Sequence, residues 1–361
     1  MNTVNDFEQI KERLSAFWAG EAMDRPAASI MCPAANPKPY IPPVSVEQKW
    51  LDAAYRVKSF ADTAGNYEYH AEAFPLFCVN LGPCVLANFV GSDYKLDETT
   101  VWFDRNPMIK DINRREKLRF DEQSIMWQTL LEITKRAAPH AGKDFLLGLT
   151  DFGGALDIAG ALLGAEELYC LMYDEPEALT ALCDEIDDVW IELFNKQNRI
   201  NDELQSGYCT WQPMWKSTPW YPLQCDLSVS ISADMFEKFA LNSLRRLAKA
   251  VGGSTVYHLD GYAEHIHLDH ILSIPEIVAI EWVPNPKGAW LNHYDKTFFS
   301  MYKKIQDSGR RLIMRAVDPA IIEPLFEVID PRGVYIATWA NSTEEALDIE
   351  KRLKKVMLKN K

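Results

Sequence analysis

The chain has 361 residues, of which 47% are hydrophobic and 25% charged, and its formal net charge is −14. This acidic balance argues against a nucleic-acid-binding protein and against a partner of anionic membranes, because both need a basic face. The seven cysteines include no CxxC pair, so neither a disulfide framework nor a zinc finger is expected. Residues 1–18 lack the layout of a signal peptide and no long apolar run follows, so we expect a cytoplasmic protein.

The first 140 residues show a weaker pattern than the remainder of the chain. An amphipathic, charged opening is followed by one strand-like segment and by a proline-rich stretch, PAANPKPYIPP, at residues 33–43. The prolines favour a loop there. We therefore treat residues 1–60 as an N-terminal extension that includes the first strand.

Beyond residue 140, strand-like runs alternate with amphipathic helices. We expect strands at 144–151, 223–226, 254–261, 277–285, 310–317 and 333–339. We expect two helices separated by YDEPEA (173–178), then helices at 232–250 with Ser232 as N-cap, 267–274, 296–309, 319–329 and 342–359. Repeated βα units of this size predict an α/β protein, a (β/α)₈ TIM barrel in one domain spanning residues 1–361. An open doubly wound sheet stays an alternative, although no GxGxxG or GxxxxGK[ST] motif supports a nucleotide-binding version.

Polar residues gather at the expected C-terminal ends of these strands, where a barrel carries its chemistry. His258 and Asp260 are two apart in an extended chain, so their side chains share a face just before Gly261 permits a turn. Glu281 follows an apolar run and needs a partner, for which Arg315 is a candidate, either as an ion pair or as a clamp for an anionic substrate. The strand-end set comprises Thr150, Asp151, Cys225, Asp226, His258, Asp260, Glu281, Arg315, Thr338 and Trp339.

Carboxylates beside a histidine suit general acid/base catalysis or metal binding. We name Asp226, His258, Asp260 and Glu281 as candidate catalytic residues. The plain alternatives are that Asp226 begins a turn and that His258 is a hydrogen-bonded core histidine.

Five aromatic residues fall within the segment 208–221, GYCTWQPMWKSTPWY from Gly207 onward, which lacks helical periodicity and reads as a loop. It could be packed by its own rings, or it could form the aromatic wall of a binding pocket. The candidate substrate-binding residues are Trp211, Trp215, Trp220, Tyr221, Arg315 and Trp339. Three more histidines, His265, His267 and His270, do not share one helical face and suggest helix-start polar residues, whereas His293 is a loop residue that could reach the pocket mouth.

Residues 145–355 resemble the uroporphyrinogen decarboxylase superfamily, which includes the cobalamin-dependent methyltransferases. The stretch LQCDLSVSISADMFEKFALNSLRRL is similar to the segment in which an aspartate, here Asp226, ends a strand and binds substrate. GGSTVYHLDG is similar to the H-x-C-G segment of the zinc methyltransferases, in which the histidine and cysteine are metal ligands. The resemblance implies a (β/α)₈ barrel and methyl transfer involving a corrinoid on a separate protein.

Departures from the family pattern limit this implication. The decarboxylases use an arginine-bearing N-terminal segment for substrate carboxylates, whereas the comparable stretch here has only Arg25 before the strand, so porphyrinogen decarboxylation is not expected. Asp260 stands at the cysteine position, and Trp339 and Ala340 stand where the second cysteine would be, so zinc held by two thiolates is not expected either. Zinc or another divalent metal could still be held by His258 and Asp260 if Cys225, or else Asp226 or Glu281, completed the site.

The sequence thus predicts a methyltransferase that moves a methyl group between a small methylated substrate and a corrinoid protein, with or without a metal. The alternatives are a metal-free decarboxylase or lyase acting on a carboxylated compound, with Arg315 as anion clamp, and a degenerate barrel that only binds a ligand. The expected partners are the small molecule and the corrinoid protein, with no nucleic acid or membrane. A homodimer is left open.

Overall fold

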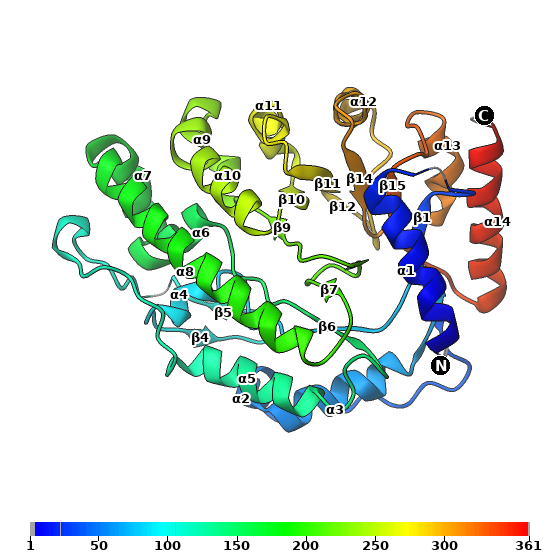
Figure 1. Ribbon diagram of the computed structural model, residues 1–361, viewed down its shortest axis with the longest axis horizontal. Coiled ribbons are helices and arrows are strands. Elements are labelled where there is room, and N and C mark those ends of the chain that lie inside the picture. Colours follow the sequence, from blue (N-terminus) through cyan, green and yellow to red (C-terminus); the bar gives the residue numbers. More distant parts are fainter. Residues whose placement is uncertain (1–3, 22, 105, 360–361) are drawn as a thin grey trace.

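The computed structural model describes residues 4–21, 23–104 and 106–359, whose strands form two main sheets (Figure 1). The larger sheet has seven strands in the order β2-β1-β15-β14-β11-β10-β9, and every neighbouring pair is parallel except β1 and β2. The smaller sheet has four strands in the order β3-β6-β7-β8. The bounds in the larger sheet are β1 (Ala27–Pro33), β2 (Tyr67–Ala71), β9 (Pro222–Leu223), β10 (Thr255–Asp260), β11 (Ile277–Val283), β14 (Arg311–Met314) and β15 (Val334–Trp339). Those in the smaller sheet are β3 (Leu76–Cys78), β6 (Leu146–Gly148), β7 (Tyr208–Cys209) and β8 (Trp215–Lys216).

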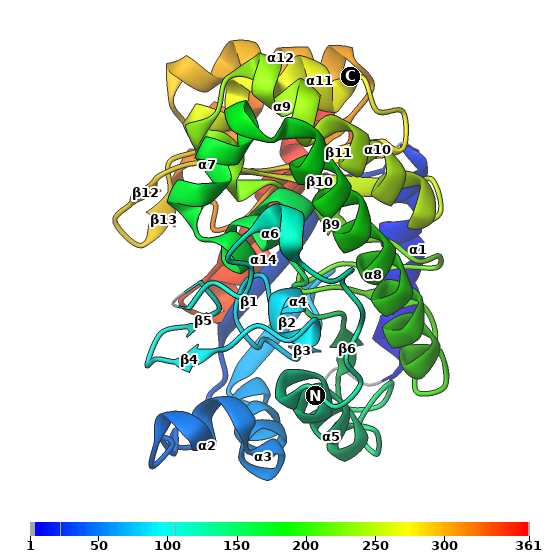
Figure 2. The same ribbon diagram turned by 90° about the vertical axis from the view of Figure 1, so that its left-hand side faces the viewer.

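The α/β fold with a parallel sheet is confirmed. Among the described residues no strand pairing joins the two sheets, so the hydrogen-bonded closure expected of a barrel is not found. Two small antiparallel hairpins lie outside the main sheets; they are formed by β4 (Lys95–Leu96) with β5 (Val101–Trp102) and by β12 (Pro286–Lys287) with β13 (Trp290–Leu291). The second hairpin projects from the body of the molecule (Figure 2).

Helices α9 to α14 form an arc along the outside of the larger sheet (Figure 1). Helix α1 covers the amino ends of strands, since Phe17 O accepts a hydrogen bond from Arg311 Nε (2.7 Å) and Trp18 Nε1 donates to Trp215 O (2.9 Å). The first helices are α1 (Val4–Ala19), α2 (Val46–Leu51), α3 (Ala53–Ala64), α4 (Leu86–Phe89), α5 (Ile125–Ala137), α6 (Ala155–Leu163), α7 (Ala165–Asp174) and α8 (Pro176–Asp202). The later ones are α9 (Ala233–Phe239), α10 (Leu241–Ala250), α11 (Leu268–Leu272), α12 (Phe299–Asp307), α13 (Ile322–Phe326) and α14 (Thr343–Lys359).

The strands and helices after residue 140 follow the predicted order, with two helices divided further. Gly164, at a φ of 89°, breaks the first predicted helix into α6 and α7, because this left-handed backbone interrupts helical hydrogen bonding. The helix predicted at 232–250 divides at Ala240 into α9 and α10. Ser232 is its N-cap, as predicted, and its hydroxyl accepts the Met235 N–H (3.3 Å).

The ladder register defines two faces of the larger sheet. Glu281 pairs with His258 on one side and with Ile313 on the other, and Ile313 pairs with Tyr335, which pairs with Ala27. Side chains at paired positions of neighbouring strands point the same way, so these residues share what we call the inner face. Because side chains alternate along a strand, Ala28, Ile30 and Cys32 of β1 point to the opposite, outer face.

A buried group of ion pairs joins the N-terminal residues Arg13 and Arg25 to Glu72, which follows β2. Arg25 donates to both carboxylate oxygens of the fully buried Glu72 (2.8 Å each), and Arg13 binds the same carboxylate (2.5 Å). Two guanidinium groups and the Ala28 N–H (2.7 Å) satisfy this carboxylate. Within the part of the chain that the structure describes, no helix has the length and apolar character needed to span a bilayer.

Candidate active site

The centre of the candidate active site is the pair formed by His258 of β10 and Glu281 of β11, on the inner face. His258 Nδ1 lies 2.6 Å from Glu281 Oε2, and both side chains are buried. The two strands pair directly at these positions, so the contact follows from the sheet register. Two of the polar residues singled out in the sequence, His258 and Glu281, are therefore in contact. The principal partner of His258 is Glu281 rather than Asp260.

Glu281 is completely buried, so its charge requires compensation. Arg315 Nε forms an ion pair with its Oε1 (2.5 Å), which is the partnership that the sequence suggested, and Gln212 Nε2 donates to Oε2. Burial by itself would raise the pKa of Glu281, but the charges of Arg315 and His258 outweigh it and hold the pKa below its usual value. Glu281 is thus an anion held by two cationic groups and one amide.

The protonation of His258 follows from this environment. Burial favours the neutral ring, but the charge and hydrogen bond of Glu281, together with the charge of Asp226, produce a net rise in its pKa. Because Glu281 is ionised and can only accept, the ring donates its Nδ1–H to it. The other nitrogen, Nε2, is 3.9 Å from Asp260 Oδ2, whose side chain is about half exposed (49%).

Asp226 lies three residues after the end of β9 at Leu223 and begins a short 3₁₀ helix at 226–230. Its backbone N–H donates to Asp157 Oδ2 (3.1 Å), and the next N–H, that of Leu227, donates to Asp157 Oδ1 (2.7 Å). The Oδ1 atom of Asp226 is buried and has no hydrogen-bond partner. Burial and the nearby Asp157 raise the pKa of Asp226 to about 7, although the charge of His258 opposes the shift.

Further acidic side chains surround Asp226, and the sequence did not assign a role to them. Burial raises the pKa of Asp151 and of Asp157 to about 6, and it raises the pKa of Glu264 to about 10, which keeps Glu264 neutral at pH 7. Asp151 was recognised only as a strand-end residue. No local sequence pattern marks Glu264 or Asp157 as a site residue. Carboxyl groups whose pKa values are separated by their surroundings are typical of acid/base sites.

Of the predicted aromatic wall, Trp211 packs edge-on against His258, with ring centroids 5.0 Å apart, and the Arg315 guanidinium lies over its ring at 5.7 Å. The other three aromatic residues named as substrate-binding candidates are buried in the core, and their role in substrate binding stays a prediction. Trp215 and Trp220 are buried, and their indole N–H groups donate to Ser206 O and Tyr208 O (3.0 Å each). Tyr221 is buried and its hydroxyl donates to Thr150 O (3.0 Å).

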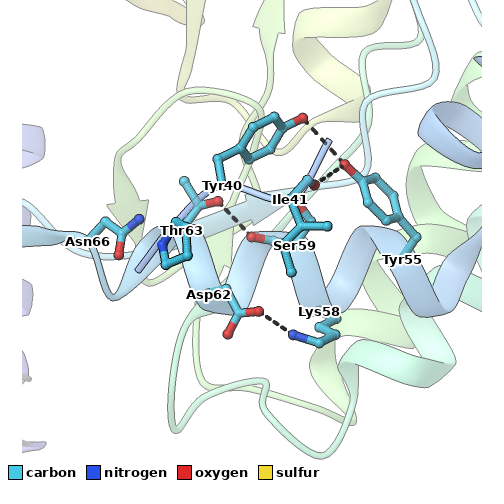
Figure 3. A pocket seen from close by; sticks show the side chains of 9 residues that line it. Tyr40, Ile41, Tyr55, Lys58, Ser59, Asp62, Thr63 and Asn66 are labelled. Atoms are coloured by element: carbon cyan, nitrogen blue, oxygen red, sulfur yellow. Dashed lines mark hydrogen bonds and ion pairs between the residues drawn. The ribbon is translucent and has the colours of Figure 1, made fainter. Parts of the chain in front are cut away.

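Trp339 ends β15 and is 43% exposed, with its ring edge-on to Tyr67 at 5.4 Å. It lines a surface hollow together with Trp290, Asp318, Asn341 and Arg352, among others. Another hollow lies between the proline-rich segment and α3, where Tyr40, Tyr55 and Asp62 are among the lining residues (Figure 3). The described residues around this second hollow include no predicted site residue.

The metal set predicted from sequence, His258, Asp260 and Cys225, does not assemble. Nε2 of His258 and Oδ2 of Asp260 could flank one ion, and Glu281 on Nδ1 resembles the carboxylate that orients a metal-bound histidine. Cys225, however, is buried and its thiol pKa is raised well above its usual value by burial. Among the described residues, the group of three whose ligand atoms lie within 4.8 Å of one another is a different one, Cys32, Glu68 and His70.

The remaining histidines have structural partners. His267 is buried, its Nε2–H donates to Ser228 O (2.9 Å) and its ring stacks on Phe236. His293 does not reach a pocket mouth, as the sequence suggested it could, but is fully buried with Nε2 2.7 Å from Arg315 O. It therefore fixes the backbone from which Arg315 reaches Glu281.

Comparisons with known proteins give a likeness at the level of structure. No protein-family model matches the sequence, and a sequence search of curated proteins finds no match. The structure is similar to that of a methyltransferase from Methanosarcina mazei, with a TM-score of 0.60 at 15% sequence identity. The match covers 96% of this chain and 98% of that one, so the two proteins share a fold over nearly their whole length.

Proposed function

We propose that the chain is a methyltransferase of the uroporphyrinogen decarboxylase-like (β/α)₈-barrel type. It would move a methyl group from a small methylated substrate to a corrinoid carried by a separate protein, with Asp226 as the acid. The observation that carries the proposal is the Asp226 carboxyl group, whose pKa is about 7 and whose buried Oδ1 has no partner within the chain. A buried polar atom without a partner is costly, and a ligand that forms a hydrogen bond with this carboxyl group would relieve that cost.

The fold supports this proposal in two ways. In chain order β1 and β15 are the first and last strands of the larger sheet, and they pair with each other in parallel. The likeness to a methyltransferase extends over nearly the whole of both chains. The fold alone does not determine the activity, because one fold hosts many activities, so the side chains of the site carry the functional assignment.

The chemistry assigned to the side chains is the stabilisation of a poor leaving group. The cobalt of the corrinoid would supply the electron pair that accepts the methyl group. As the bond between methyl carbon and heteroatom breaks, its electron pair goes to the heteroatom, which takes the proton from Asp226. The raised pKa of His258 favours its protonated ring, and that positive charge would stabilise the carboxylate that Asp226 becomes. Trp211 would provide an apolar contact for the donor.

Two alternatives receive less support. A lyase acting on a carboxylated compound would use Arg315 as anion clamp, but Glu281 already takes that charge. Metal assistance at His258 would need a third ligand beyond Asp260, and the described residues place none at ligand distance. The proposed reaction therefore uses no metal ion at His258.

The test is methyl transfer to free cob(I)alamin from a tertiary methylamine, a methyl ether and a methyl thioether, followed by the absorbance of the cobalamin. We expect one donor class to react, and Asp226→Asn to lower kcat by about 10²–10⁴-fold, the usual contribution of a general acid. The rate should fall as pH rises through about 7, because the carboxyl group must be protonated. Asp187→Asn is the matched control, since Asp187 is a buried carboxyl group of α8 with a pKa of about 7 that bonds Ser243, away from the site. Full activity in Asp226→Asn, or no transfer from any donor, would overturn the proposal.

A further inference from the structure

A second group of ligand-type side chains lies on the outer face of the larger sheet, at the carboxyl end of β1. Cys32 is directly opposite Glu68 in the antiparallel ladder with β2, and His70 is two residues further along β2. All three side chains therefore share the face opposite to His258 and Glu281. Cys32 is fully buried, whereas the side chains of His70 and Glu68 are 15% and 39% exposed.

The three ligand atoms form a compact triangle. Cys32 Sγ lies 3.6 Å from His70 Nε2 and 3.9 Å from Glu68 Oε2, and these last two atoms are 3.4 Å apart. A tetrahedral zinc ion with bonds of about 2.3 Å to sulfur and about 2.0–2.1 Å to nitrogen and oxygen separates sulfur from the other ligands by about 3.5 Å, and nitrogen from oxygen by about 3.3 Å. The triangle in the chain matches these edges to within about 0.4 Å, so an ion could enter with little rearrangement.

We propose that Cys32, Glu68 and His70 bind a zinc ion. A thiolate and a carboxylate neutralise its two positive charges, and mixed sulfur, nitrogen and oxygen ligands suit zinc better than harder ions such as magnesium. Three protein ligands leave a fourth position, which the exposure of Glu68 opens to water. This site is independent of the methyl-transfer proposal and lies on the other face of the sheet from it.

A fourth residue orients the carboxylate. Thr343, the first residue of α14, donates its hydroxyl to Glu68 Oε2 (2.7 Å). Such outer contacts fix a metal ligand in place, and their loss typically weakens binding about 10–100-fold. A zinc ion here would connect β1, β2 and the start of the closing helix α14, three segments that are far apart in the sequence.

Zinc binding would displace the proton of the Cys32 thiol, since the ligand is the thiolate. The tetrahedral match and the Thr343 contact, which do not depend on protonation, carry the assignment.

The experiment is metal analysis of the full chain after dialysis, followed by titration of the metal-free protein with zinc and with cobalt(II) in competition with a chelator. We expect one equivalent of zinc per chain in the parent, with thiolate-to-cobalt charge-transfer absorption in the cobalt form. Cys32→Ser should lose both signals, Glu68→Gln should bind at least about tenfold more weakly, and Thr343→Val about 10–100-fold more weakly.

Matched controls separate this site from its alternatives. Cys183→Ser changes another buried cysteine, in α8, and His258→Gln changes the inner face, so both should keep the full zinc content. Circular dichroism of each variant checks its folding. If Cys32→Ser does not fold, Glu68→Gln decides, because that side chain is partly exposed. Equal zinc affinity in the parent and Glu68→Gln, or no zinc binding by the parent, would overturn the proposal.

Discussion

The raised pKa of Asp226 has a consequence for stability that can be measured without knowing the substrate. Replacing this residue by asparagine removes a group that cannot ionise freely in the folded protein, so Asp226→Asn should be more stable than the parent at neutral and alkaline pH. The substitution is expected to stabilise the fold while it abolishes the proposed chemistry. Such opposition between stability and activity is common where a site holds a group in an unfavourable environment.

The size and sign follow from linkage. The pKa of Asp226 rises from 3.8 to about 7 on folding, a shift of about 3 units, and each unit is worth about 1.36 kcal/mol. Because the folded pKa is the higher one, the carboxyl group costs nothing below pH 3.8, and the penalty grows until pH passes about 7. The upper limit is therefore about 4 kcal/mol at pH 8 and about 2 kcal/mol at pH 5. Any contact that the new amide fails to make reduces these gains.

Urea unfolding at pH 5 and pH 8 provides the assay, with the free energy of unfolding taken from the midpoint and slope. Asp260→Asn is the comparison, because its half-exposed side chain should change stability by no more than about 0.5 kcal/mol. A gain for Asp226→Asn that is larger at pH 8 than at pH 5 supports the reasoning. If Asp226→Asn is no more stable than the parent at pH 8, or if its gain does not depend on pH, the burial argument for this carboxyl group is wrong.

Two further predictions concern other parts of the molecule. Burial lowers the pKa of His293 to about 4, so the stability that its neutral ring provides is present above pH 6.5 and is lost as pH falls toward 4. The pKa shift of about 2.5 units corresponds to at most about 3 kcal/mol of stability. In thermal unfolding between pH 7 and pH 4, His293→Gln should therefore lose less stability than the parent as the pH falls. An equal dependence of the unfolding temperature on pH in both proteins would contradict this. Gly154→Ala should destabilise by about 1–3 kcal/mol or more, because a Cβ there would lie 2.2 Å from Gln224 O. In Gly65→Ala the added carbon meets only ordinary contacts, the nearest at 3.6 Å, so equal unfolding midpoints of the two alanine variants would refute the steric argument.

The C-terminal part of the fold was predictable because its strands are buried on both faces and its helices have regular apolar spacing. His258 and Glu281 could be singled out for the same reason, since each is a polar residue in the C-terminal half of an apolar strand. What the sequence could not supply was the lateral register that makes them partners. That register depends on which strands become neighbours, and single-chain periodicity does not contain this information.

The features that the sequence did not reveal have a similar origin. Trp215 and Trp220 lie in an aromatic-rich segment, as the wall of a pocket would, but in the structure their indole N–H groups donate to backbone carbonyls and their rings pack into the core. Glu264 has an ordinary polar neighbourhood in sequence, and only folding buries it. Cys32 and His70 are 38 positions apart and meet through the antiparallel pairing of β1 with β2, whose register the sequence pattern does not contain.

Glu281 illustrates what a ligand would encounter on arrival. Its carboxylate is already bound by Arg315, His258 and Gln212, and His293 in turn holds the backbone of Arg315. A centre that is ordered before binding loses little side-chain freedom when a ligand enters. The free-energy cost of arranging these charges is therefore met once, when the protein folds, and not again each time a ligand binds. More of the interaction energy with the ligand then remains for affinity and for discrimination between ligands.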